Sequence, residues 1–127
     1  MAKETLSIPG FNKGMFVVWD MYTQAAFKVN VTLKDTVKTY VENSKQTREI
    51  EPALAHGSAW MQGDNLAITI DIPQSPKFEH PMYQNTIFTP KGKVAGYVVT
   101  ICVEDQPGGD DDYNDLLVTL TAWHAKG

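Results

Sequence analysis

The sequence predicts an all-β protein, a single-domain antiparallel β-sandwich. Three observations lead to this prediction: runs of alternating apolar and polar residues, turn sequences rich in Gly and Pro between these runs, and the lack of a sustained helical period. A period of two is typical of a strand with one buried and one solvated face. Short strands separated by regular turn sequences favour a sandwich.

Five strands are predicted along the chain. The first is the short apolar run 14–20, GMFVVWD. Segment 27–34 alternates Phe, Val, Val and Leu with polar residues, and 66–72 repeats this alternation with Leu and Ile. Segment 97–103, YVVTICV, is again apolar and rich in β-branched residues, and 116–123, LLVTLTAW, alternates once more. These segments supply the predicted core.

Turn sequences separate the predicted strands, for example Pro9-Gly10 and Pro90-Lys91-Gly92. The only helix candidate, 44–55, is interrupted by Pro52 and shows no sustained 3.6-residue period. Three prolines also interrupt the region from Pro73 up to Asn85. Both regions are therefore predicted to be loops, with room for one helical turn.

Length and composition restrict the class of protein. The chain has 127 residues, 43% hydrophobic and 20% charged, which is typical of one globular domain, here 1–127. No apolar run is long enough to span a membrane, and the start lacks the apolar core of a signal peptide. We expect a cytoplasmic protein, with release by a non-classical route as the alternative. No basic cluster is present, so nucleic acid is not expected as a partner.

An acidic segment lies between the last two predicted strands. Residues 104–115, EDQPGGDDDYND, contain six carboxylates and no Lys or Arg. The net charge of the chain is −4, so the other residues carry +2 once the −6 of this segment is removed. Crowded like charges raise one another's pKa and repel, and a bound cation relieves this penalty. The segment is therefore a candidate cation site.

The donor types in this segment favour calcium. Ca²⁺ accepts about six to eight oxygen ligands in irregular geometry, whereas Mg²⁺ prefers a tight octahedron. In an extended chain Asp110, Asp112 and Asn114 point to one side, and the two glycines at 108–109 allow the chain to fold back. The spacing is not that of an EF-hand, because the sixth position from Asp110 is Asp115 and not glycine. The alternative is a solvated acidic turn, as most charge runs are.

No catalytic constellation stands out in the sequence. Cys102 is the only cysteine and lies within the apolar segment 97–103, which favours a buried thiol over a nucleophile. His56, His80 and His124 lack the spacing of a zinc site. A contiguous run of acids also differs from the separated carboxylate pair of a glycoside hydrolase. The sequence therefore predicts a protein that is not an enzyme.

The string GGDDDYNDLLVTLTAW, 108–123, resembles the C-terminal segment of the calcium-mediated bacterial lectins that bind fucose and mannose. Their pattern is an acidic pair, a glycine-containing turn, D-x-D-Y-N-D, and an apolar strand that reaches a tryptophan. The resemblance implies a nine-stranded sandwich in which two neighbouring calcium ions bridge the loop and the hydroxyls of a neutral sugar. The implied calcium ligands are Glu104, Asp110, Asp112, Asn114 and Asp115, and the implied sugar contacts are Asp105, Asp110, Asp112 and Asp115.

Three further expectations rest on the same resemblance. The carboxylate of Gly127 is expected to enter the site of a partner subunit, which implies a homodimer or homotetramer. Asp20, near the end of the 14–20 strand, is a candidate calcium ligand, and Thr23 is a candidate sugar contact. The segment 21–24, MYTQ, is bulkier than the Ser/Gly loop of the family, so sugar specificity is expected to differ. The alternative class is a calcium-stabilised structural or assembly β-sandwich that binds no sugar.

Overall fold

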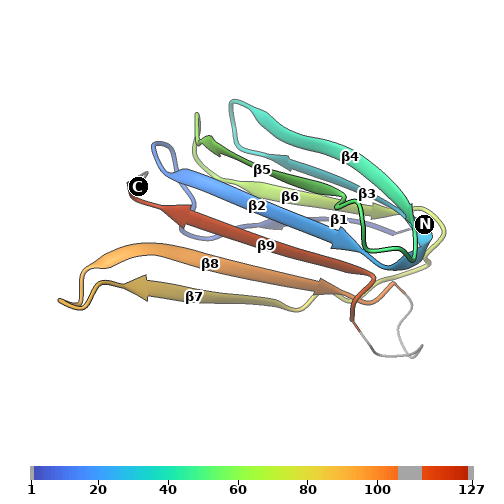
Figure 1. The fold of residues 1–127 in the computed structure, drawn as a ribbon. Coiled ribbons are helices and arrows are strands. Elements are labelled where there is room, and N and C mark those ends of the chain that lie inside the picture. Colours follow the sequence, from blue (N-terminus) through green and yellow to red (C-terminus); the bar gives the residue numbers. More distant parts are fainter. Residues whose placement is uncertain (1, 106–112, 126–127) are drawn as a thin grey trace.

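The described residues form two antiparallel β-sheets (Figure 1). The computed structural model describes residues 2–105 and 113–125, and these contain nine strands and no helix. The all-β prediction is thus confirmed. The strands are β1 (Ala2–Ser7), β2 (Phe16–Thr23), β3 (Ala25–Lys34), β4 (Thr39–Thr47), β5 (Ala55–Trp60), β6 (Ala67–Ile72), β7 (Met82–Phe88), β8 (Val94–Val103) and β9 (Leu116–Trp123).

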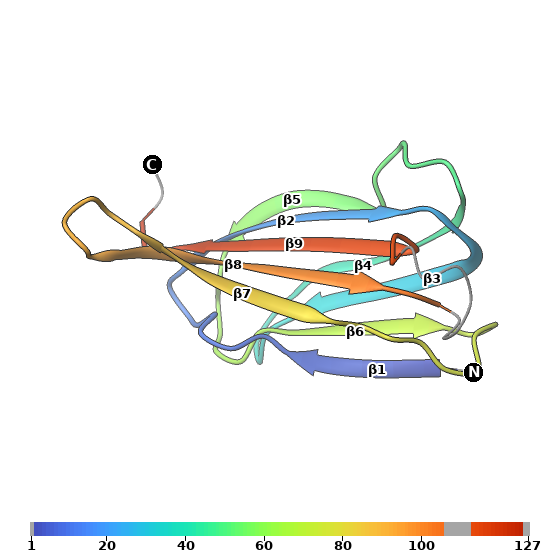
Figure 2. The same cartoon turned by 90° about the horizontal axis from the view of Figure 1, so that it is seen from below.

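The two sheets pack face to face as a sandwich (Figure 2). The four-stranded sheet has the order β1-β6-β3-β4, and the five-stranded sheet has the order β5-β2-β9-β8-β7. Strands β8 and β9 are hydrogen-bonded neighbours in the interior of the larger sheet, and the acidic segment connects them. This connection fixes the position of the candidate cation site at one end of the sandwich.

The core forms between the sheets because the central strands alternate as the sequence predicts. Residues Val29, Val31 and Leu33 of β3 are buried, and so are Ile68, Ile70 and Ile72 of β6. The inward residues of β2, β8 and β9 cover them from the other sheet. Each fully buried aliphatic side chain contributes about 1.5–3 kcal/mol. These side chains therefore fix which face of each central strand points inward.

Part of the loop prediction is wrong. Residues 44–47 belong to β4, and β7 begins at Met82, within the region predicted to be a loop. Strands β1 and β5 were also not predicted, and all four lie at the edges of the sheets. The reason is physical: an edge strand is covered on fewer sides, so it needs little apolar alternation. In β4, for example, only Val41 is buried.

A buried carboxylate holds the turn between β3 and β4 against the segment that follows β5. Asp35 is 6% exposed. Its Oδ1 accepts hydrogen bonds from the N–H groups of Val37 (2.7 Å) and Lys38 (2.7 Å), and its Oδ2 from the N–H groups of Gln62 (3.2 Å) and Gly63 (2.9 Å) and from the hydroxyl of Tyr40. Burial by itself would raise the pKa of Asp35, but these hydrogen bonds lower it to about 2. Burial and the bond to Asp35 raise the pKa of Tyr40 to about 12.

Strong acid is expected to remove the stability that Asp35 contributes. The folded pKa of about 2 lies below the ordinary value of 3.8, so between these values the unfolded chain binds more protons than the folded chain. The contribution, about 2 kcal/mol, is therefore complete above pH 4 and is lost as the pH falls toward about 2. Urea unfolding of the wild type and of Asp35→Asn across this range checks it, because their difference in unfolding free energy should shrink on acidification. A difference that stays constant with pH would contradict the assignment.

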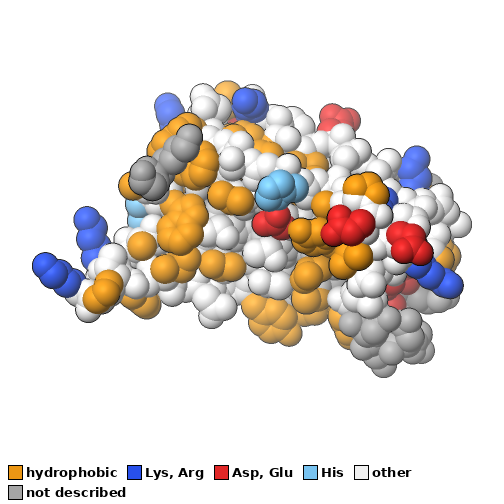
Figure 3. Space-filling model, in the orientation of Figure 1, with side chains coloured by type: hydrophobic (Ala, Val, Ile, Leu, Met, Phe, Trp, Pro, Cys, Tyr) orange, Lys and Arg blue, Asp and Glu red, His pale blue; other side chains and the backbone are white. Residues whose placement is uncertain are grey.

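On the outer face of the five-stranded sheet, apolar side chains form patches among uncharged groups, and few charged side chains lie between them (Figure 3). At one end, Trp60, Phe16 and Trp123 lie side by side on adjacent strands, and the Phe16 and Trp60 rings meet edge to face with centroids 5.2 Å apart. Near the middle of β2, Asp20 Oδ1 lies 2.5 Å from His56 Nδ1. Lys and Arg side chains lie around the periphery of this view. The described residues include no helix able to cross a membrane.

Candidate metal centre

The candidate site lies where β8 ends and β9 begins. Val103, the last residue of β8, pairs with Leu116, the first residue of β9. The N–H of Asp115 donates to the carbonyl of Val103 (3.1 Å), which extends the ladder by one residue. Glu104 and Asp115 thus lie next to each other just beyond the ends of neighbouring strands, although ten residues separate them in the sequence. The sheet itself brings the two carboxylates together.

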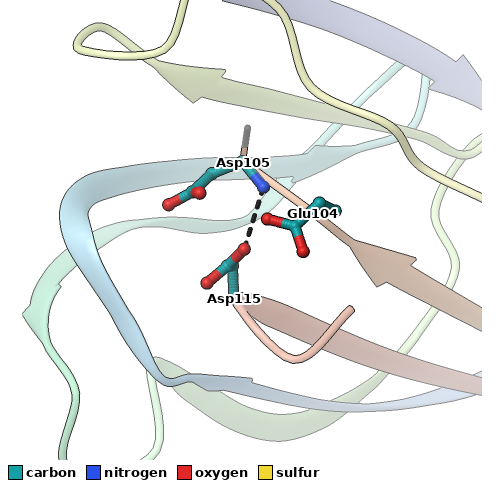
Figure 4. Close-up of side chains that lie close together, drawn as sticks. All are labelled: Glu104, Asp105 and Asp115. Carbon is teal, nitrogen blue, oxygen red and sulfur yellow. Dashed lines mark hydrogen bonds between the residues drawn. The ribbon is translucent and has the colours of Figure 1, made fainter. Parts of the chain in front are cut away.

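Three carboxylates meet at this point (Figure 4). Glu104, Asp105 and Asp115 each place a carboxylate oxygen within 4.8 Å of the others. The N–H of Asp105 donates to Asp115 Oδ2 (2.9 Å), which fixes the orientation of that carboxylate. Glu104 is 1% exposed and Asp115 is 8% exposed, whereas Asp105 is half-buried. The cluster therefore has a buried floor and one partly open side.

Residues from the segment between β6 and β7 support the cluster. Glu79 and Glu104 exchange two backbone hydrogen bonds, each 3.0 Å long. The Ser75 hydroxyl donates to the carbonyl of Asp105. The Tyr113 hydroxyl donates to Glu79 Oε2 (2.5 Å). The chain on both sides of 106–112 is therefore anchored to a segment far away in the sequence.

The electrostatics of this arrangement favour a bound cation. Burying an ionised carboxylate is costly, and placing three carboxyl groups within a few ångströms adds like-charge repulsion. A hard divalent cation among the oxygens offsets both costs. Among residues 2–105 and 113–125, the donors in the cluster are oxygens, without a thiol or imidazole. The cluster therefore suits Ca²⁺ or Mg²⁺ and not zinc.

The structure brings together only some of the residues that the sequence indicated. Glu104, Asp105 and Asp115 form the cluster, and Asn114 is half-buried directly before Asp115. Tyr113 has a positive φ of 53°, so the backbone turns sharply before Asn114. The other residues expected from the acidic segment and the tail lie outside the described residues: Asp110, Asp112 and Gly127.

Asp20 is not part of the cluster. It lies mid-strand on the outer face of β2, opposite His56 and Thr119 and in contact with the His56 imidazole. Three residues separate it from the end of β2, which is about 10 Å along a strand. Asp20 thus lies outside the described cluster, and its role as a calcium ligand stays a prediction. The strand does not end at Asp20, as the sequence suggested, but continues to Thr23.

Thr23 lies close to the cluster, and its side chain faces the interior of the sandwich. It pairs with Leu116, and the next residue, Gln24, donates its N–H to the carbonyl of Asp115 (3.3 Å). The Thr23 side chain is fully buried, on the same face of β2 as Met21, and its hydroxyl has no hydrogen-bond partner in the described part of the chain. A contact between this hydroxyl and a bound sugar stays a prediction.

Two supporting residues were not found from the sequence. Glu79 and Ser75 lie in a proline-interrupted segment without a recognisable motif. Their role depends on the packing of that segment against the end of β8, which no local pattern reveals. In the sequence, Glu79 is a single glutamate outside the acidic segment, and single glutamates are too common to indicate a supporting role.

Solved structures with the same fold include three bacterial lectin chains. A Chromobacterium violaceum lectin, CV2L, solved in complex with alpha-methyl-fucoside, has a TM-score of 0.63 and 17% identity and covers 97% of this chain and 96% of its own. A high-affinity mannose-binding lectin of Ralstonia solanacearum gives the same values. The C-terminal domain of the BC2L-C lectin from Burkholderia cenocepacia has a TM-score of 0.68 and 21% identity, over 99% of this chain and 98% of its own.

Comparison of the amino-acid sequence with protein families and curated proteins gives no match. The likeness is therefore one of three-dimensional structure, and it extends over nearly the whole chain. It confirms the β-sandwich architecture.

Proposed function

We propose that this protein binds carbohydrate in a calcium-dependent manner, without catalysis. One observation carries the proposal: the cluster of Glu104, Asp105 and Asp115, two of them buried, at the end of a sandwich that also occurs in bacterial lectins. The proposed ligands are neutral monosaccharides such as fucose or mannose. Of the lectins with this fold, CV2L was solved in complex with alpha-methyl-fucoside, and the Ralstonia solanacearum lectin is a high-affinity mannose-binding lectin.

Calcium explains how a weakly binding neutral sugar is held. Two neighbouring hydroxyls of a sugar can replace water on a bound Ca²⁺, which takes oxygen ligands in flexible geometry. In the proposed site, Glu104, Asp115 and Asn114 bind calcium together with Asp110 and Asp112, and two ions share the acidic segment. Asp105 lies on the partly open side of the cluster, which supports a contact with sugar.

The proposed partners are carbohydrate and further copies of this chain, and not nucleic acid. Lectin sites gain avidity when several act together, which supports a homodimer or homotetramer. A contribution of Gly127 to the site remains a prediction. Asp115 directly precedes the first residue of β9, whereas Ala125 follows the last one. A calcium ligand from Gly127 would therefore have to come from a second copy of the chain. A cytoplasmic location with non-classical release also remains a proposal.

The second candidate is a structural protein that uses calcium to hold loops or subunits and binds no sugar. The same observation favours it, since the cluster joins β8, β9 and the segment before β7. In this case calcium would contribute to stability alone. The two candidates differ in whether a saccharide adds stability beyond that of calcium.

Thermal unfolding of the full chain is expected to separate the two candidates. Calcium should raise Tm over that in a chelator, and methyl α-fucoside or methyl α-mannoside should raise it further only when calcium is present. A sugar at 100 times its Kd adds about 2.7 kcal/mol to stability, which is easily measured. A calcium effect without any sugar effect across a glycan panel would favour the structural candidate. A sugar effect that persists in the chelator would contradict coordination through calcium.

A further inference from the structure

Strand β7 is an open and unprotected edge of the five-stranded sheet. It is the last strand in the order β5-β2-β9-β8-β7, and Figure 1 shows no described strand beyond it. Its sequence, MYQNTIF, contains no charged residue and no proline. Proteins usually protect exposed edges with charges, prolines or bulges, because unpaired backbone groups recruit other strands. The register shift at the end of β7 places the extra residue, Ala95, in β8 and leaves β7 regular.

The backbone groups on the open side of β7 can be identified. The N–H of Cys102 donates to the carbonyl of Pro81 (3.1 Å), and the N–H of Thr89 donates to the carbonyl of Lys93 (2.7 Å). Odd-numbered residues therefore face β8, and in an antiparallel ladder the even-numbered ones point their N–H and C=O away from it. Within residues 2–105 and 113–125 those groups have no backbone partner. The residues concerned are Met82, Gln84, Thr86 and Phe88.

We propose that β7 pairs with β7 of a second copy of this chain, antiparallel and about a two-fold axis at Asn85. In this register Met82 lies opposite the partner's Phe88, and Gln84 lies opposite the partner's Thr86. All four outward-facing residues then fall in hydrogen-bonded pairs, which gives about eight backbone hydrogen bonds. A shift by two residues in either direction would leave some of these groups unpaired. The two five-stranded sheets become one continuous sheet.

The side chains of β7 match one another in the same register. On the side that faces the sandwich interior, Met82 meets Phe88, and these are 38% and 62% exposed because the smaller sheet does not cover them. On the outer side Tyr83, 61% exposed, meets Ile87, and Asn85 meets its own copy. Apolar residues thus meet apolar residues and polar residues meet polar ones. A strand that reads alike in both directions is suited to pairing with itself.

The charges beyond the two ends of β7 are also complementary. The turn from β7 to β8 carries Lys91 and Lys93, whereas the other end lies beside Glu79, Glu104 and Asp105. Antiparallel pairing brings the lysine turn of each copy toward the acidic end of the other. Two pairs of opposite charges then flank the paired strands, and both favour the same orientation. The proposal places one candidate metal centre at each end of the joined strands.

Charge substitutions at the two-fold position test this interface. In the proposed register the two copies of Asn85 lie opposite each other. Asn85→Lys and Asn85→Asp therefore each place two like charges in contact. Each variant should raise the dissociation constant of the homodimer at least about tenfold. A mixture of the two variants places opposite charges there and should restore the assembly as a heterodimer. Native mass spectrometry of the full chain in calcium resolves the three species by mass. Restoration in the mixture also shows that both variants are folded.

Ser44→Lys and Ser44→Asp serve as matched controls, because Ser44 is exposed on β4, the edge strand of the other sheet. They should leave the assembly unchanged. A wild-type chain that is monomeric at high micromolar concentration would overturn the proposal. So would single Asn85 variants that assemble as the wild type does, or a mixture that stays dissociated. Weakening by the Ser44 variants alone would assign the interface to β4 instead.

Discussion

Replacing Asp115 with alanine is expected to abolish calcium binding. Asp115 is 8% exposed, lies within 4.8 Å of two other carboxylates and accepts the N–H of Asp105. Alanine removes both a ligand and the group that positions the neighbouring backbone. A lost ligand should lower calcium affinity by at least about 100-fold. Titration calorimetry of the full chain measures this directly, and in the variant calcium should no longer raise Tm.

Two further variants make the result specific. Asp115→Asn keeps an oxygen that can accept the Asp105 N–H but loses the charge, so it should retain the fold and bind calcium weakly. Glu42→Ala removes an exposed carboxylate on β4 and should leave calcium affinity unchanged. Asp112→Ala is expected to abolish calcium binding as well, because Asp112 is proposed to bridge two ions. Unchanged affinity in Asp115→Ala would show that calcium, if bound, lies elsewhere.

Replacing Asp35 with alanine is expected to lower the free energy of unfolding by about 3–5 kcal/mol. Five donors share this buried carboxylate, and alanine leaves several of them buried without an acceptor. The turn between β3 and β4 would then separate from Gly63 and its neighbours. Urea unfolding at neutral pH measures the loss as a lower midpoint with an unchanged m-value.

Two variants distinguish the Asp35 network from ordinary surface contacts. Tyr40→Phe removes one of the five hydrogen bonds and should cost about 1–2 kcal/mol. Asp64→Ala removes an exposed carboxylate that accepts a single hydrogen bond from the Lys13 N–H (2.9 Å) and should cost well under 1 kcal/mol. If Asp35→Ala were no more destabilising than Asp64→Ala, the carboxylate would not hold the turn.

The central strands were predictable from sequence and the edge strands were not. Segments 14–20, 27–34, 66–72, 97–103 and 116–123 correspond to β2, β3, β6, β8 and β9, each flanked by a strand on both sides. Their inward residues are mostly apolar, so the alternation is plain. Strands β1, β4, β5 and β7 each lack one neighbour and expose more of their side chains. Their order in the sheets depends on long-range pairing that no local pattern contains.

The candidate site was predictable to a similar degree. Charge density and the family resemblance indicated Glu104, Asp105 and Asp115, and the structure brings these three together. The positions of Asp20 and Thr23 relative to the cluster could not be predicted, because they depend on where β2 ends and which face of it is buried. The end of a strand is harder to predict than the strand itself, because no local pattern marks the last paired residue. The sequence placed the end at Asp20, whereas β2 continues through Thr23.

The anchored residues Glu104 and Asp115 lie on either side of the connector 106–112. The two residues adjoin central strands, and hydrogen bonds to Val103 and Glu79 fix the chain on both sides of the connector 106–112. Changes of sequence or length within such a connector need not disturb the core, since loop length affects stability only weakly. During evolution, ligand preference could therefore diverge at this position while the sandwich stayed the same. For protein engineers, the same two anchors delimit a segment in which the positions other than Asp110 and Asp112 can be randomised as a library.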